Sequence, residues 1–199
     1  IMEKIIGYLP GDGIGPEVAA QGKKALEAIA QKFGHKFTFN EALVGAVAID
    51  ATGDPYPAET HEVCKSSDAV LFGAIGDPKY DNDPTSAVRP EEGLLRMRKQ
   101  LGLFCNIRPV KAYDNLLDKA PLKNDRLVGA DMVTFRELTS GLYFGSPRGR
   151  TEDGKSAFET CTYTEEEILR MAKPAFEAAK NRKNKVTLVD KANVLVTSR

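Results

Sequence analysis

The sequence lacks the features that mark several classes of protein. Across 199 residues, 28 basic side chains balance 28 acidic ones, so no excess of one charge draws the chain to nucleic acid or to an anionic membrane surface. No apolar run approaches the roughly 18 residues of a membrane span, and the longest, residues 69–76, is far shorter. We therefore expect neither nucleic-acid nor membrane partners.

Cysteine and histidine are equally scarce. Cys64, Cys105 and Cys161 stand far apart without a CxxC pair, and the chain holds only two histidines. This scattered, odd count gives no zinc pattern and fits a reducing compartment. The apolar stretch at the N-terminus is too short for a signal peptide and soon meets proline and glycine. We therefore expect a cytoplasmic protein.

The composition is that of an ordinary globular chain, with 42% hydrophobic and 28% charged residues. Apolar runs at residues 4–9, 36–44 and 69–75 predict strands, and the last is apolar throughout, as a strand covered on both faces must be. Helices are expected at residues 16–33, opened by Pro16 and ended by Gly34, and at residues 59–65. This alternation predicts an α/β fold with a largely parallel sheet and helices on both faces.

The chain changes character after residues 76–93, a stretch rich in proline and aspartate in which we expect no regular structure. A helix is expected at residues 90–101. A polar, turn-rich segment follows at 146–156, with strands at 131–138, 142–144, 157–163 and 185–189. We expect two domains, residues 1–102 and 103–199, the second a smaller α/β domain.

A long helix is expected at residues 164–181. Thr164 and Glu167 have the spacing of a capping box at its start. Its apolar residues recur at helical spacing, which predicts that they are core. They are Ile168, Met171, Ala172, Ala175, Phe176 and Ala179.

A glycine-rich turn, GDGIGP, follows the first strand and opens the first helix, so it resembles a phosphate-binding turn. It fails the dinucleotide fingerprint because Pro16 stands where that motif needs glycine, and it lacks the GK[ST] ending of a P-loop. A plain strand-to-helix turn is the alternative interpretation.

The helix at 90–101 places Glu91, Leu94, Leu95 and Arg98 on one face. An arginine within an apolar band needs an anionic partner or a route to water. This face would suit a ligand with one apolar branch and one anionic end. The alternative is an arginine that reaches solvent or is paired within the fold.

Four further residues have chemistry that a site could use. Arg108 and Arg136 lie in apolar strand contexts, and converging arginines suit a di- or tricarboxylate. Tyr143 stands between glycines, and Lys191 follows an apolar strand, where a partly buried lysine could act as a base. A core aromatic and a solvated loop lysine are the alternatives for these two.

Five segments together carry a resemblance that covers residues 4–199: GDGIGPEV, GAIGDPKYDNDP, RPEEGLLRMRKQLGLFCNIRP, RELTSGLYFG and VDKANVL. They resemble the decarboxylating β-hydroxyacid dehydrogenases, the isocitrate/isopropylmalate dehydrogenase family, and most of all its branch that acts on 3-isopropylmalate. The resemblance implies NAD-dependent oxidation of that substrate and loss of CO2 to give 2-oxoisocaproate in leucine biosynthesis. It also implies a non-Rossmann α/β fold, a homodimer and a Mg or Mn ion.

The resemblance further implies roles for single residues. Arginines matching Arg98, Arg108 and Arg136 hold the two carboxylates of the malate moiety, Lys191 matches the general base, and Tyr143 helps to protonate the enol. In a homodimer Lys191 would serve the active site of the neighbouring copy. The pocket for the isopropyl group would be lined by Leu94, Leu95 and Val194, with Asn193 and Glu91 also at the substrate. Cofactor contacts are expected from Ile14, Gly76, Asp77, Pro78, Asp81 and Glu91.

The sequence departs from the family pattern in two loops. It has Gly-Asp-Pro at residues 76–78, where Gly-Gly-Pro is common, and Thr-Ser-Gly at 139–141, where Thr-Gly-Gly is common. Asp77 would add a charge near the cofactor.

The family pattern continues beyond residue 199 and there supplies the aspartates that bind the metal, so we assign no metal ligand within this chain. We expect an N-terminal fragment in which both domains are incomplete. A truncated, inactive chain is one alternative. A family member acting on isocitrate, homoisocitrate or tartrate is another, although a polar branch would leave unpaired groups against Leu94 and Leu95.

Overall fold

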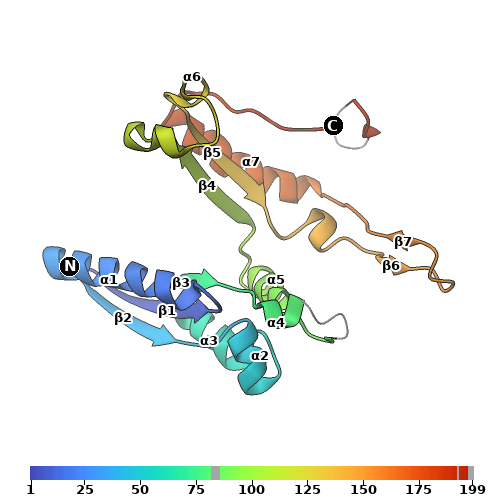
Figure 1. Cartoon of the computed structure of the whole chain (residues 1–199), viewed down its shortest axis with the longest axis horizontal. Coiled ribbons are helices and arrows are strands. Elements are labelled where there is room, and N and C mark those ends of the chain that lie inside the picture. The colour runs from blue at the N-terminus through green and yellow to red at the C-terminus, as the bar shows by residue number, and fades with distance from the viewer. Residues whose placement is uncertain (82–85, 192, 197–199) are drawn as a thin grey trace. The chain divides into compact units, whose positions relative to one another are not determined.

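A three-stranded parallel sheet organises the first compact unit, residues 1–103 (Figure 1). The structure is a computed structural model and describes residues 1–81, 86–191 and 193–196. Strands β1 (Glu3–Gly11), β2 (Lys36–Glu41) and β3 (Ala69–Ala74) are ordered β2-β1-β3. Both neighbours of β1 run parallel to it. The predicted parallel α/β sheet is therefore confirmed.

Helices pack on this sheet and close the core. Helix α1 (Gly15–Phe33) contacts β1 and β3, and α3 (Ala58–Ser66) contacts β1. Helix α1 has Pro16 in its first turn and ends at Gly34 in the left-handed conformation, as predicted. Helix α5 (Pro90–Gln100) was also predicted. The buried core cluster is drawn from strand, loops and helices and consists of Leu9, Val44, Tyr56, Cys64 and Met97.

Three expectations for this unit were wrong. Strand β2 ends at Glu41 because the chain turns inward, where Val44 joins the core, and a short helix, α2 (Ala46–Thr52), follows. The stretch 76–93 contains a helical turn, α4 (Pro78–Asp81), which its proline content did not suggest. Strand β3 is half-buried over most of its length instead of covered on both faces, because it forms an edge of the sheet among the described residues.

An antiparallel strand pair organises the second unit, residues 104–199. Strands β4 (Cys105–Lys111) and β5 (Asp131–Glu137) pair in register from Cys105 opposite Glu137 to Lys111 opposite Asp131. Helix α7 (Glu165–Lys180) packs against β5 and begins at Thr164 with the predicted capping box. Shorter elements complete this unit: η1 (Asp114–Lys119), α6 (Asn124–Leu127), η2 (Gly141–Tyr143), β6 (Gly149–Arg150) and β7 (Ala157–Phe158).

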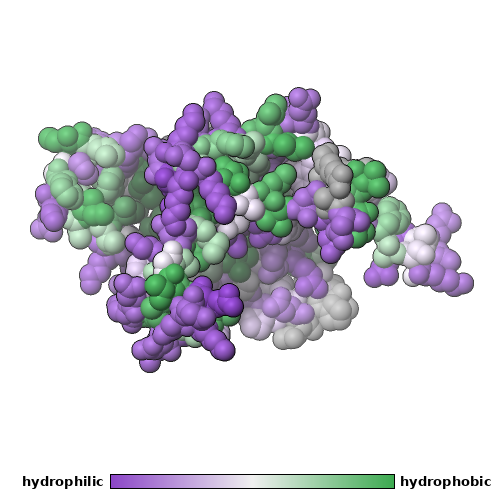
Figure 2. Space-filling view, turned by 90° about the horizontal axis from the view of Figure 1, so that it is seen from above, coloured by the Kyte–Doolittle hydropathy of each residue, from purple (hydrophilic) through white to green (hydrophobic). Residues whose placement is uncertain are grey.

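Several sequence expectations for the second unit were also wrong. Residues 142–144 form part of a 3-10 turn, only the first two residues of 157–163 are in a strand, and residues 185–189 are irregular. The stripe on α7 is only partly core, because Ile168 and Phe176 are more than half exposed and Ala179 is its one buried member. A two-stranded sheet is too narrow to cover a whole helix face. Figure 2 shows apolar side chains on the surface among hydrophilic ones.

The described helices give no candidate for a membrane span, since none combines the length and the apolar character that crossing would need. This finding concerns residues 1–81, 86–191 and 193–196 only.

A carboxylate clamp joins β5, the turn after it and α7. Glu137 accepts hydrogen bonds from the Thr139 and Ser140 backbone N–H groups at 2.7 Å each and from Arg170 Nη2 at 2.6 Å. Burial raises the pKa of Glu137, but the hydrogen bonds from Ser140, Arg170 and Thr139 outweigh it and hold this pKa below its usual value. Since Tyr143 follows the turn closely, this clamp sets the path of the chain to Tyr143.

We predict that Glu137→Gln destabilises the second unit in a pH-dependent way. Because the pKa of Glu137 in the folded state lies below its unfolded value of 4.5, the ionised carboxylate stabilises the folded state fully above pH 4.5. This stabilisation is lost as the pH falls through the folded-state pKa. At neutral pH the variant should lose about 2 kcal/mol of unfolding free energy, because charge-assisted hydrogen bonds are lost. Urea unfolding between pH 3 and pH 7 measures this free energy. The difference in unfolding free energy between the variant and the wild type should become smaller towards pH 3. Glu159→Gln, at a carboxylate 59% exposed, is the control.

Candidate functional site

The carboxyl ends of β1 and β3 form a topological switch point, because the chain leaves β1 for β2 on one side and later returns to β3 on the other. Open α/β sheets bind ligands at such edges. Asp12, directly after β1, donates its backbone N–H to the Ala74 carbonyl at 2.8 Å and joins the two strand ends. Its buried carboxylate accepts backbone hydrogen bonds from Ala46, Val47 and Gly76. Sequence reasoning missed this role of Asp12.

The glycine turn is packed backbone against backbone. A Cβ on Gly11 would lie 2.0 Å from the Ala74 carbonyl oxygen, and one on Gly15 would lie 2.2 Å from the Pro10 carbonyl oxygen. These two glycines therefore serve close packing, which favours the strand-to-helix turn for them. Ile14, between them, is 59% exposed at the start of α1. It is available to a ligand at this edge.

The expected cofactor residues 76 and 91 lie close together. A Cβ on Gly76 would stand 3.6 Å from Glu91 Oε1, and one on Gly13 would stand 3.7 Å from the Gly76 carbonyl oxygen. The glycine turn, the segment after β3 and the first turn of α5 thus meet at the sheet edge. Both contacts are at ordinary van der Waals distance, with the Glu91 carboxylate beside Gly76.

The segment after Gly76 is anchored to α2. The Asp77 carboxylate accepts a hydrogen bond from the Lys79 N–H at 2.9 Å, which starts the turn of α4 at Pro78. The Lys79 ammonium and the Tyr80 hydroxyl both donate to Asp50 Oδ1, at 2.6 and 2.8 Å. The hydrogen bonds from Lys79 and Tyr80 hold the pKa of Asp50 below its usual value. Asp81, at the end of α4, is exposed.

Helix α5 carries four expected substrate residues: Glu91 is exposed, and Leu94, Leu95 and Arg98 are half-buried. Leu94 packs against the core cluster, so it serves the core whatever else it touches. Arg96 on the same helix donates to Asp54 and to the Tyr56 carbonyl, which fixes α5 on the preceding loop. This anchoring role of Arg96 was also not predicted.

Three expected residues of the second unit come together. Arg136 lies opposite Asn106, and Arg108 lies opposite Thr134, so both arginines are on the same face of the β4–β5 pair as diagonal neighbours. Arg108 Nε donates to Asn106 Oδ1, and Arg136 Nη2 donates to the Tyr143 hydroxyl oxygen. The Arg136 guanidinium also lies 5.6 Å from the centre of the Tyr143 ring. This face therefore offers two guanidinium groups and a phenol.

The remaining predicted residues of this unit lie on another segment of the chain. Lys191, Asn193 and Val194 lie on the exposed, irregular segment after α7, where the Lys191 carbonyl accepts the Val194 N–H. Between the Lys191 amine and Tyr143 the described residues show no hydrogen bond. The described ranges also contain no group of three His, Cys, Asp or Glu side chains that could hold a metal ion.

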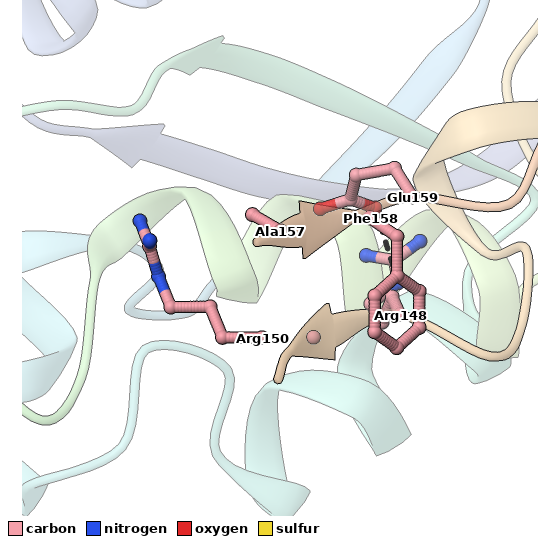
Figure 3. Close-up of a pocket in the computed structure, with 6 residues that line it drawn as sticks. Arg148, Arg150, Ala157, Phe158 and Glu159 are labelled. Atoms are coloured by element: carbon pink, nitrogen blue, oxygen red, sulfur yellow. Dashed lines mark ion pairs between the residues drawn. The ribbon is translucent and has the colours of Figure 1, made fainter. Parts of the chain in front are cut away.

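A shallow pocket lies on the β6–β7 hairpin, lined by Arg148, Gly149, Arg150, Ala157, Phe158 and Glu159 (Figure 3). Arg148 and Glu159 form an ion pair at 3.5 Å, while the Arg150 side chain extends away from them. Arg148 also donates to the Leu142 carbonyl at 2.6 Å, which ties this hairpin to the turn that carries Tyr143. No signal in the sequence pointed to this link.

Comparisons with known sequences show the family of this chain. The family model described as isocitrate/isopropylmalate dehydrogenase matches residues 5–199. The chain is 53% identical over 198 residues to a 3-isopropylmalate dehydrogenase of Bacteroides fragilis, covering 100% of this chain and 55% of the relative. It is 51% identical over 195 residues to that of Aquifex aeolicus, covering 97% and 53%. The chain thus spans about half the length of the curated relatives it matches.

Solved structures share the fold. An isocitrate dehydrogenase from Methylococcus capsulatus matches with a TM-score of 0.79 at 26% identity, covering 98% of this chain and 53% of that one. A β-decarboxylating dehydrogenase from Thermococcus kodakarensis matches with a TM-score of 0.67 at 32% identity, covering 98% and 51%. Sequence and fold lead to the same assignment. This chain belongs to the isocitrate/isopropylmalate dehydrogenase family.

Proposed function

We propose that the complete gene product carrying this chain is a cytoplasmic enzyme that oxidises and decarboxylates 3-isopropylmalate with NAD, yielding 2-oxoisocaproate for leucine biosynthesis. The observation that carries the proposal is the shared face of Arg108 and Arg136 with the Tyr143 hydroxyl bound to Arg136. Relatives 51–53% identical over nearly the whole chain are 3-isopropylmalate dehydrogenases, which supports the choice of substrate.

The arginines bind the carboxylates of the malate moiety. Guanidinium groups offer paired N–H donors that match the two oxygens of a carboxylate. Arg108 and Arg136 are exposed on one face of the β4–β5 pair, so both can reach one small dianion. Arg98 on α5 is the third proposed contact.

Tyr143 supplies the last proton of the reaction. The base takes the proton of the substrate hydroxyl, the carbon that bears this hydroxyl gives up a hydride, and the carboxylate of the resulting keto acid leaves as CO2, which produces an enolate. Because the Tyr143 oxygen accepts its hydrogen bond from Arg136, the phenolic proton remains available for donation to the enolate carbon. The product is then the 2-oxo acid.

The first unit holds the cofactor at the carboxyl edge of its sheet. Ile14, Gly76, Asp77 and Glu91 are the proposed contacts, on the geometry described above. NAD, when bound, supplies the hydride acceptor. The resemblance implies a Mg or Mn ion as well, but the described residues gather no set of ligands for one.

Lys191 is the proposed general base, acting in the active site of a second copy. Lys191 and its neighbours Asn193 and Val194 are exposed on an irregular segment. Residues that contact a second chain are exposed in this way when one copy is considered alone. The exposed apolar residues Ile168, Leu169 and Phe176 on α7 support association.

The substrate comparison tests the proposed function. We expect the complete gene product to use 3-isopropylmalate with a kcat/KM at least about a hundredfold above that for isocitrate, because the carboxylate branch of isocitrate would face Leu94 and Leu95. NADH absorbance with each substrate measures this. A higher kcat/KM for isocitrate than for 3-isopropylmalate would show that the proposed substrate is wrong.

Replacement of Arg136 tests the shared face. In Arg136→Lys the paired donors to a carboxylate and the hydrogen bond to Tyr143 are lost, so kcat/KM should fall about a hundredfold. Steady-state kinetics with 3-isopropylmalate measures the change. Arg126→Lys, at a side chain 79% exposed on α6, is the matched control and should keep wild-type kinetics. Equal kinetics for the two variants would remove Arg136 from the site.

Mixing of two inactive variants tests the shared active site. Lys191→Ala and Tyr143→Phe should each lose turnover, and unfolding and refolding them together should restore activity, because a mixed dimer contains one site with both residues intact. The restored rate and the molar mass by light scattering are measured. Failure of the mixture to regain activity, with a dimeric mass, would place both residues in the site of one copy.

A further inference from the structure

We propose that Asp12 is a positioning residue for the cofactor segment Gly76–Asp81, and that it controls NAD binding without touching the reacting atoms. This inference rests on the proposed function, in which the segment contacts NAD. It concerns a residue of the glycine turn to which neither the sequence pattern nor the resemblance gave a role of its own.

The Asp12 carboxylate is buried and fully engaged with backbone. Asp12 is only 3% exposed. Its Oδ2 accepts hydrogen bonds from the N–H groups of Ala46 at 2.7 Å and Gly76 at 3.0 Å, and its Oδ1 accepts one from the N–H group of Val47 at 2.9 Å. One side chain therefore joins three segments that are far apart in sequence. They are the end of β1, the first turn of α2 and the segment after β3.

The space around the carboxylate is closed on the side of α2. A Cβ on Gly45, which has φ +84, would lie 2.2 Å from Asp12 Oδ2. The backbone of the α2 start thus approaches as closely as a glycine permits. Ala46 is buried, so its N–H depends on Asp12 for an acceptor.

Helix α2 gives the cofactor segment a second anchor. Lys79 and Tyr80 on α4 bind Asp50 on α2, as described above. The segment is therefore held at Gly76 through Asp12 and at α4 through Asp50. Asp12 binds the start of α2 and Asp50 lies on α2, so both anchors connect the segment to the same helix. Asp50 is exposed and its bonds compete with water, so the buried Asp12 is the stronger anchor.

The hydrogen-bond pattern predicts a graded series of variants. In Asp12→Asn, the amide oxygen placed at Oδ2 keeps the bonds from Ala46 and Gly76, and only the bond from Val47 is lost. In Asp12→Ala all three are lost. Because Gly76 lies beside Glu91 at the cofactor edge, its displacement should weaken NAD binding, while the arginine face in the second unit is unaffected.

Asp68 provides a matched control. Its carboxylate also joins two sheet segments, accepting the Ile5 N–H at 2.8 Å and the Lys4 ammonium at 2.6 Å, but it lies at the opposite end of the strands. Asp68→Ala therefore removes a more exposed link between strand and loop without touching the carboxyl edge. It separates a loss of stability from a loss of positioning.

Kinetics of the complete gene product test the proposal. We expect the KM for NAD to rise at least about tenfold in Asp12→Ala and less in Asp12→Asn, with the KM for 3-isopropylmalate within about twofold of wild type in both. Asp68→Ala should leave both KM values unchanged. If the KM for NAD rises no more in the Asp12 variants than in Asp68→Ala, the proposal is wrong.

Hydrogen exchange provides a readout that needs neither turnover nor cofactor. Backbone amides of residues 76–81 should exchange fastest in Asp12→Ala, which loses the bond from the Gly76 N–H. They should exchange moderately faster in Asp12→Asn than in wild type or Asp68→Ala, because a neutral amide oxygen is a weaker acceptor than a carboxylate, as followed by mass spectrometry of the peptide. Unchanged exchange there overturns the proposal, even if Asp12→Ala does not fold. Absence of wild-type turnover with 3-isopropylmalate would reject the proposed function instead, and the exchange comparison would still decide the role of Asp12.

Discussion

Close backbone contact between β1, β3 and the first turn of α1 is the constraint on which the first unit depends. Gly11, Gly15 and Gly73 allow it, since a Cβ at any of them would lie within 2.2 Å of a carbonyl oxygen. This contact leaves the end of β1 inside the fold, and the residue that follows, Asp12, is buried. A buried carboxylate must then be satisfied by N–H donors, and the start of α2 and Gly76 supply them.

The same constraint shapes the candidate cofactor edge. The segment after β3 leaves the sheet at Gly76, bonded to Asp12, and meets the first turn of α5 at Glu91. Helix α5 is in turn held by Arg96 on the loop that precedes α3. The edge is thus assembled from four stretches of chain by backbone contacts and polar anchors, while Leu94 and Met97 also hold α5 on the core cluster.

In the second unit, strand register has the corresponding role. Antiparallel pairing of β4 with β5 places Arg108 and Arg136 on one face, and a slip of one residue in either strand would send one of them to the other face. Glu137 and Arg148 then fix the turn after β5, so that Tyr143 meets Arg136. Both units keep large apolar side chains at the surface, and the chain spans about half the length of its curated relatives.

Local periodicity, capping residues and ordered motifs were enough to predict the alternation of elements, the parallel sheet, the caps of α1 and α7 and the family. They did not reveal α2 or α4, which are short and depend on Asp12 and Asp50, contributed from elsewhere in the chain. Periodicity marked Ile168 and Phe176 as apolar, but their exposure follows from tertiary packing, since burial requires a partner surface. Likewise, only the strand register and the turn after β5 decided that Arg108, Arg136 and Tyr143 share a face, because contacts between distant segments leave no mark in local sequence.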